Sequence, residues 1–321
     1  MFEQTPVKTA AVAATIAALA AYAIFGGYFS REIVIEIAIL AILAISLDFV
    51  AGFGGMISLC HGAIFGLGAY TFAVMTAMWD QPGALAALAA ILVATAFGLA
   101  VGAVTSKTTG IFFIMATLAF GQMVYVATFE SQWLGGDDGM SGVARFDLSP
   151  IGIELGDSLQ FALFCLAVLG TAYALLAMVL RAGFGQTLIG VHTNEDRMRA
   201  LGLSTWRHKA AAFAISSAVA GAGGVLAAQH TQFVSPELMV WTLSGEVLVI
   251  VILGGIGTLV GPVIGAAVLI LLKHEISTYT DHWHMFIGVV LIATVLAGGR
   301  GIFGQIEHLI AGGGRGAGRD A

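Results

Sequence analysis

Long apolar runs constrain this chain more than any other feature of its sequence. A helix needs about 20 mostly apolar residues to cross the roughly 30 Å of hydrocarbon in a bilayer. The runs that approach or reach this length are 9–28, 33–51, 56–78, 84–104, 110–129, 159–180, 209–229 and 284–299. Only 10% of the residues are charged, whereas a soluble domain carries about 25%. We therefore expect an all-α, polytopic membrane protein in which residues 1–321 form a single transmembrane domain.

The segment 244–273 fits no single upright span. At about 1.5 Å per residue it is near 45 Å long, too long for one span and short for two. Gly254, Gly255, Gly257, Gly261 and Pro262 in its middle favour a break. Two short spans here give about ten helices and put both termini on one side.

Basic residues, which favour the cytoplasmic side of a membrane protein, support this topology. With both termini inside, the cytoplasmic basic residues are Lys8, Lys107, Arg181, Arg197, Arg199, Arg207, Lys209, Arg300, Arg315 and Arg319. Arg31, Arg145 and Lys273 lie outside, and a single span at 244–273 gives a weaker asymmetry. The loop 130–158 is then external, and the glycine-rich tail 311–321 is a flexible cytoplasmic end.

A dense charged island, "GVHTNEDRMRALGLSTWRHKAAAF", runs from Gly190 to Phe213 between apolar segments. Thr193 at the N-cap with Asp196 three residues later fits a capping box, and Gly202 suits the C-terminal end. The pattern predicts a two-turn helix over about 194–201. Such a short helix is marginal in water, so packing must hold it. Met198 and Leu201 offer a small apolar face, although an ordinary solvated loop would carry similar charges.

The chain has no G-x-x-x-x-G-K-[ST] phosphate loop. If ATP drives its activity, the ATPase is another chain that must touch this one in the cytoplasm.

Four stretches together resemble the permeases of branched-chain amino acid ABC transporters. Their coupling loop and the helix after it are similar to "GQTLIGVHTNEDRMRALGLSTWRHKAAAFAISSAVAGAGGVLAA". The other similar stretches are "SLDFVAGFGGMISLCHGAIFGLGAYTFAV", "GIFFIMATLAFGQMVYV" with "GGDDGMSG", and "SPELMVWTLSGEVLVIVILGGIGTLVGPVIGAAVL". They span about residues 44–270 in family order. The external loop and the island resemble the second, longer permease of the pair.

This resemblance implies that residues 193–202 form a coupling helix that docks on an ATPase. The coupling residues would be Thr193, Asn194, Glu195, Asp196, Arg197, Met198, Arg199, Leu201 and Gly202. The implied partners are a paralogous permease, two cytoplasmic ATPase subunits and a periplasmic substrate-binding protein, assembled at the bacterial inner membrane. The implied cargo is leucine, isoleucine and valine, with urea or other small amides and acids as the alternative. The chain would be a transport subunit, without bond chemistry of its own or a cofactor.

Polar residues within the apolar runs are candidates for the translocation path, because ionisable groups in hydrocarbon usually face the protein interior or a water-filled route. The candidates are Ser58, His61, Gly62, Glu246, Gly254, Gly257 and Gly261. Each has a structural alternative: His61 as a packed, hydrogen-bonded residue, Glu246 as part of a helix start capped by Ser244, and the glycines as close-packing faces. Spacing of four residues would put Gly257 and Gly261 on one such face. Glu36 and Asp48 lie near opposite ends of their run.

The external loop offers Asp137 and Asp138 as contacts for a binding protein. Their spacing lacks the ligand pattern of a calcium loop, and no metal site is expected. Cys60 and Cys165 lie in apolar runs and do not indicate a disulfide framework.

An ion-coupled secondary transporter is the rival class, and it needs acids near the membrane midplane. Asp48 and Glu246 lie too near the ends of their runs for this role. A membrane-embedded enzyme would need a nucleophile and base, and a nucleic-acid-binding protein would need a basic patch. Neither is found in the sequence.

Overall fold

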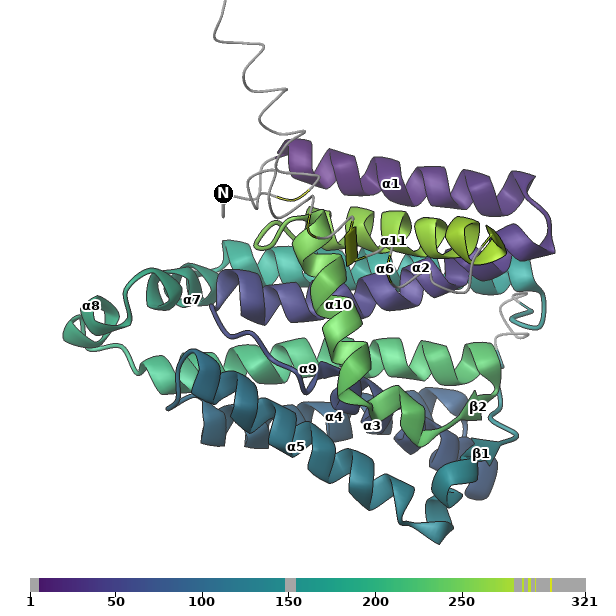
Figure 1. Cartoon of the computed structure of the whole chain (residues 1–321), viewed down its shortest axis with the longest axis horizontal. Helices are drawn as coiled ribbons and strands as arrows, with labels where there is room; N and C mark the ends of the chain where they lie inside the picture. Colours follow the sequence, from purple (N-terminus) through teal and green to yellow (C-terminus); the bar gives the residue numbers. More distant parts are fainter. Residues whose placement is uncertain are drawn as a thin grey trace, which may run out of the picture.

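The structure, a computed structural model, describes residues 6–147 and 154–279 together with positions 285, 288, 289, 292 and 301. The described part is helical, in agreement with the predicted all-α membrane fold (Figure 1). The α-helices are α1 Pro6–Phe25, α2 Tyr28–Asp48, α3 His61–Ala73, α4 Gly83–Thr105, α5 Ile111–Phe129, α6 Ser158–Arg181, α7 Gly183–Thr193, α8 Glu195–Ala200, α9 Thr205–Thr231, α10 Trp241–Gly254 and α11 Val260–Tyr279.

Short elements complete the described chain. The π-helical turns are η1 Phe49–Phe53 and η2 Val74–Met78, and the 3-10 turns are η3 Gln132–Leu134, η4 Gly136–Asp138 and η6 Pro236–Met239. Strands β1 Met140–Ser141 and β2 Phe233–Val234 pair antiparallel, with Met140 opposite Val234.

Seven of the described helical segments are long and apolar enough to cross a membrane. They are Tyr28–Phe53, His61–Met78, Gly83–Thr105, Ile111–Phe129, Ser158–Arg181, Thr205–Thr231 and Val260–Thr278. The apolar part of α1 and the whole of α10 are shorter. The predicted run 284–299 lies largely outside the described residues, as does the tail 311–321. The number of about ten spans and the side of each terminus therefore stay predictions.

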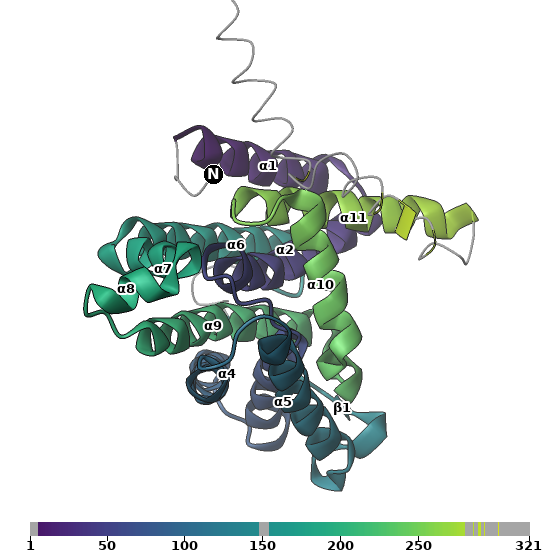
Figure 2. The same cartoon turned by 60° about the vertical axis from the view of Figure 1, so that its left-hand side comes forward.

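Helix α2 forms the centre of the bundle. It packs against α6, α9, α10 and α11, while α9 also packs along α3 and α4. Nearly every residue of α2 from Ile33 to Asp48 is buried, as expected for a helix that is apolar on all sides. Helices α2, α6, α9 and α11 run along a common direction, and α10 crosses them at a steep angle (Figures 1 and 2). Helix α10 thereby contacts α2, α3 and α11.

The charged island and the loop after α5 lie at opposite ends of the bundle. Helices α7 and α8 form one end in Figure 1, and β1 and β2 lie near the other. The predicted topology, with the island and the 130–158 loop on different sides of the membrane, requires this separation.

Irregular backbone shortens one predicted span and divides the segment that was predicted to break. The chain from residue 54 to residue 60 is not helical, so the predicted span 56–78 begins too early and α3 starts only at His61. The segment 244–273 forms two helices, α10 and α11, separated by residues 255–259. Positive φ angles at Gly255, Gly257 and Leu259 end the helical path there. Gly257 consequently lies in the break, and the predicted helical face shared with Gly261 is wrong.

Gly254 and Gly261 bring the two edges of the break into backbone contact. A Cβ atom on Gly254 would overlap the carbonyl oxygen of Gly261. The close approach that small residues allow between membrane helices therefore operates here between the end of α10 and the start of α11.

Candidate functional site

The predicted island helix is α8, and its cap differs by one residue from the prediction. The Asn194 side chain accepts a hydrogen bond from the backbone N–H of Arg197 at 2.9 Å, which makes Asn194 the N-cap. Thr193 instead ends α7, where its hydroxyl donates to the carbonyl of Ile189. The two helices follow each other directly, so α7 ends at the residue that the sequence predicted as the N-cap of α8.

The C-terminal end of α8 has the predicted glycine. Gly202 has a φ of +84°, and the N–H of Leu203 donates to the carbonyl of Met198 at 3.2 Å. This left-handed turn satisfies carbonyl groups that the short helix would leave without partners.

Glu195 is the centre of a polar cluster that joins α8 to the start of α9. Its carboxylate receives the Lys209 Nζ at 2.5 Å, the Arg199 guanidinium at 2.6 Å and the Thr205 hydroxyl at 2.9 Å. The Lys209 side chain is only 7% exposed and that of Glu195 only 19%. Partial burial opposes ionisation of Glu195, but its hydrogen bonds and the charge of Lys209 outweigh this and hold its pKa below the usual value.

The remaining side chains of α8 divide into an inner and an outer set. Met198 is half-buried and lies over Gly190 of α7, where an added Cβ would come within 2.8 Å of the Met198 methyl group. Leu201 is 70% exposed. Asp196, Arg197 and Arg199 are exposed as well. The two predicted apolar anchors therefore differ, since Met198 packs within the protein and Leu201 is open to a partner.

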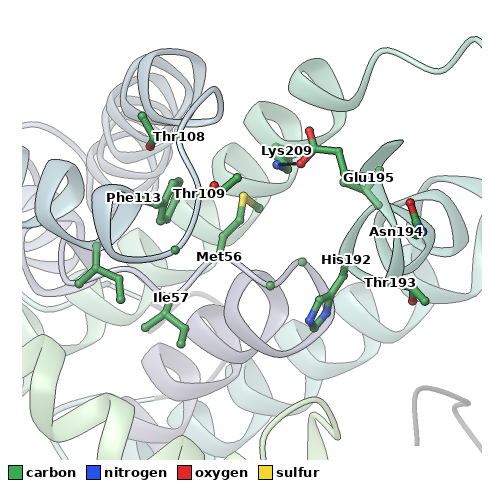
Figure 3. A pocket seen from close by; sticks show the side chains of 15 residues that line it. Met56, Ile57, Thr108, Thr109, Phe113, His192, Thr193, Asn194, Glu195 and Lys209 are labelled. Atoms are coloured by element: carbon green, nitrogen blue, oxygen red, sulfur yellow. Dashed lines mark hydrogen bonds and ion pairs between the residues drawn. The ribbon is translucent and has the colours of Figure 1, made fainter. Parts of the chain in front are cut away.

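A pocket of about 250 Å³ lies beside the start of α8 (Figure 3). Residues 54–57, 108–110, 113–114 and 191–195 line it together with Lys209. The paired side chains of Glu195 and Lys209 lie on one side of it, and that of His192 on another (Figure 3). The pocket therefore connects the α8 region with the irregular 54–60 segment. None of the predicted path residues lines it.

His61 belongs to a buried polar network that crosses three helices. Its Nε2 atom lies 2.8 Å from the Ser216 hydroxyl of α9, and that hydroxyl donates to the carbonyl of Ser46 in α2 at 2.5 Å. Because a hydroxyl has a single proton, Nε2 must be the donor toward Ser216. The other ring nitrogen, Nδ1, is buried with no hydrogen-bond partner among the described residues.

The start of α3 is fixed by a residue of α10. The N–H of Gly62 donates to the Ser244 hydroxyl at 2.8 Å. Ser244 lies inside α10, whose N-cap is Val240, so the alternative in which Ser244 caps its own helix is wrong. Ser58 is buried and accepts from the N–H of Cys60 at 3.2 Å.

Other polar groups near these helices lack partners among the described residues. The Glu246 Oε1 atom of α10 and the Gln122 Nε2 atom of α5 are buried without hydrogen bonds. Gln122 was not among the sequence candidates, because a single amide in an apolar helix gives no pattern. Gly254, Gly257 and Gly261 are buried in backbone packing. Participation of these residues in a path stays a prediction.

The two acids of the loop after α5 are exposed. Asp137 and Asp138 form part of η4, and the β1–β2 pair joins the following residues to the end of α9. Among the described residues, no group of three or more His, Cys, Asp or Glu side chains is arranged to hold a metal ion. Cys60 and Cys165 are buried, free thiols.

Comparison with known proteins decides the family. A family model described as "Branched-chain amino acid transport system / permease component" matches residues 29–295, from the start of α2 to beyond α11. The chain belongs to this family. Members of this permease family are transport components, which agrees with the expectation of a transport subunit rather than an enzyme.

Curated relatives of this permease include both LivM and LivH proteins. The LivM permease of Salmonella typhimurium is 27% identical over 279 residues, which cover 79% of this chain and 65% of LivM. LivM of Escherichia coli K12 has the same identity and coverage. LivH of Salmonella typhimurium is 25% identical over 287 residues, covering 83% of this chain and 92% of LivH. The chain thus spans about two thirds of the length of the LivM proteins. No solved structure matches it.

Proposed function

We propose that this protein is a membrane-spanning permease subunit of a binding-protein-dependent ABC importer for leucine, isoleucine and valine. Its family and the printed names of LivM and LivH, high-affinity branched-chain amino acid transport system permease proteins, support this cargo. Urea and other small amides or acids remain the alternative cargo. The somewhat higher identity to LivM favours the longer permease of a pair.

The assembly follows from this function. The permease pairs with a second permease, two cytoplasmic ATPase subunits and a periplasmic substrate-binding protein in the bacterial inner membrane. In this assembly α8 faces the ATPase. Asp137 and Asp138, which shortly precede β1 at the opposite end of the bundle, face the binding protein.

The observation that carries the proposal is the Glu195 cluster. A six-residue helix such as α8 is unstable by itself, yet here a largely buried ion pair with Lys209 attaches it to α9. Asp196 and Arg197 are exposed on the same helix, as is Leu201 at its C-cap. A rigidly held helix with an apolar tip and a charged rim suits docking into a cleft of another protein.

The geometry also offers a route for movement. When ATP closes the two ATPase subunits, α8 moves with them, and the Glu195–Lys209 pair transfers the movement to α9. Helix α9 packs along α2, α3 and α4, so a shift of α9 changes the packing around the His61 network. Substrate and ATP then select between outward-open and inward-open populations.

The rival class of ion-coupled transporters gains no support from Asp48. Both oxygens of this buried carboxylate accept hydrogen bonds from backbone N–H groups, so Asp48 already has a structural role as an acceptor for this backbone.

Replacement of Leu201 by Asp tests the docking. The permease should still fold in the membrane, because Leu201 is exposed in the isolated subunit. A charge placed at an apolar contact should weaken ATPase binding by about 2 kcal/mol or more, roughly 30-fold. Co-purification with the ATPase and hydrolysis stimulated by the loaded binding protein are the measurements, and both should be lost.

Leu201→Met is the matched control, because it keeps an apolar side chain of similar volume. This variant should still bind the ATPase and should still show ATP hydrolysis stimulated by the loaded binding protein. Full ATPase binding and full stimulation in Leu201→Asp would contradict docking through α8. Competition between leucine, urea and acetamide for stimulated hydrolysis identifies the cargo.

A further inference from the structure

Asp48 is a buried carboxylate with defined hydrogen-bond partners in another part of the chain. It is the last residue of α2 and is completely buried. Its Oδ1 accepts a hydrogen bond from the N–H of Gly257 at 2.6 Å, and its Oδ2 accepts one from the N–H of Leu259 at 2.9 Å. Both donors lie in the break between α10 and α11. One side chain therefore joins the end of α2 to a segment more than 200 positions later in the sequence.

The break has a specific conformation that presents these donors. Gly257 and Leu259 have φ angles of +76° and +57°, and the second is uncommon for a residue with a bulky side chain. Thr258, between them, braces the turn: its hydroxyl donates to the carbonyl of Gly255 at 2.8 Å and accepts from the N–H of Gly261 at 2.9 Å. Successive N–H groups in such a turn form a concavity that binds an anion.

The end of α2 continues into a π-helical turn that packs closely against the break. Directly after Asp48 the chain forms the π-helical turn η1, and π-helical turns occur frequently at functional positions. Gly52 in that turn lies against the break, since an added Cβ would overlap both the Asp48 carboxylate and the N atom of Gly257. We call this contact the joint: it consists of Asp48 and Gly52 at the end of α2 and the backbone of residues 257–259 in the break, which approach each other closely.

The carboxylate and the break depend on each other. A buried charge without hydrogen bonds is strongly unfavourable, so Asp48 requires the N–H groups of the break. The left-handed turn at Leu259 in return requires the carboxylate to satisfy its buried N–H. The break can therefore change conformation only if Asp48 moves with it or releases it.

We propose that Asp48 is a positioning residue for transport, which fastens the α10–α11 break to α2 so that these three helices move as one unit. This inference rests on the proposed importer function. Near the joint, the Ser46 carbonyl of α2 accepts the hydroxyl of Ser216 from α9. On the other side of the joint, Ser244 of α10 holds the start of α3. The joint thereby links α2, which is bonded to α9, the helix that receives the ATPase movement, to α10, which carries Glu246.

Two substitutions of Asp48 and one control test the joint in the complete transporter. Asp48→Asn keeps the shape and one acceptor oxygen but removes the charge and turns a donor toward one backbone N–H. Asp48→Leu removes both acceptors. The control is Thr105→Val, because the Thr105 hydroxyl of α4 is also buried and donates to the carbonyl of Val101 in the same helix.

Stimulated ATP hydrolysis and substrate uptake are compared at equal amounts of assembled complex. We expect both Asp48 variants to co-purify with the ATPase, since α8 is untouched, while uptake falls about tenfold or more, as expected for loss of a hydrogen bond to a charged group. Thr105→Val should behave as wild type.

A labelling experiment reports the joint itself. Ile256 lies in the break and is half-buried, so an Ile256→Cys variant reports on its opening, and the two native cysteines are buried. Combined with Asp48→Asn, this cysteine should react with a soluble thiol reagent about tenfold faster than in the Asp48 protein. A purely structural defect would lower the yield of complex without changing uptake per complex.

Unchanged uptake and unchanged labelling in Asp48→Asn would overturn the proposal, even if Asp48→Leu failed to assemble. Failure of the importer function is seen separately, as a wild-type complex whose ATP hydrolysis does not respond to the loaded binding protein.

Discussion

The carboxylate of Glu195 determines how α8 is held, because it is bonded to Lys209, Arg199 and Thr205 at once. Glu195→Gln should leave the Lys209 ammonium largely buried without a charged partner. We expect a loss of about 2 kcal/mol in the stability of this region. Adding Lys209→Met should recover part of that loss, because it removes the unpaired charge. Thermal unfolding of the two variants in detergent measures the difference.

Asp196→Asn is the control, since the Asp196 side chain is 96% exposed and lies 3.9 Å from Arg199; it should change little. The difference between wild type and Glu195→Gln should also depend on pH. The folded state lowers the pKa of Glu195, so the stabilisation is present above the pKa of the unfolded chain. It is lost only as the pH falls below the usual carboxyl range of about 4. A double variant no more stable than Glu195→Gln would contradict this pairing.

For individual residues, the sequence predicts the charged island and its short helix but not the ion pairs and hydrogen bonds that its side chains form. Capping signals act over three or four residues, so the short helix and Gly202 were predictable. The Glu195–Lys209 pair joins positions 14 residues apart on two helices, and its geometry depends on the turn between them. Asp48 is a stronger example, since its partners are known only once α10 and α11 are packed against α2.

Among the elements, the helices follow from the length of the apolar runs, and the length and glycine content of 244–273 predicted its break. The non-helical stretch 54–60 and the close backbone contacts at each break could not be read from the sequence. Two glycines of α10 allow a direct comparison. A Cβ on Gly254 would overlap the backbone of Gly261, but a Cβ on Gly245 meets nothing within 4 Å.

Gly254→Ala should therefore destabilise the protein by about 1–3 kcal/mol, because the break would have to shift to accept the methyl group. Gly245→Ala should be neutral, or stabilising by up to about 1 kcal/mol through its higher helix propensity. Thermal unfolding of the two purified variants measures this, and Gly254→Ala should unfold at a lower temperature than Gly245→Ala. Equal stability of both variants would mean that the contact between the two helices is looser than described.

For the whole molecule, the arrangement of helices places Ser141 and Asp196 at opposite ends of the bundle. Both residues are exposed, and the basic residues of the sequence predict that the Asp196 end is cytoplasmic. Single cysteines at these positions should give opposite results with a membrane-impermeant thiol reagent added to spheroplasts. Ser141→Cys should be labelled, and Asp196→Cys should be labelled only after the membrane is permeabilised. Labelling of Asp196→Cys in sealed spheroplasts would invert the topology.

The break after α10 also affects how the newly made chain enters the bilayer. With 14 residues, α10 is about 21 Å long, less than the hydrocarbon thickness. In its polar backbone end at 255–259, the N–H groups of Gly257 and Leu259 find their hydrogen-bond partner on α2. A ribosome that has completed only α10 therefore presents the translocon with a segment that lipid alone retains poorly. Stable integration of α10 must wait for the synthesis of α11 and for α2, already in place, to receive both.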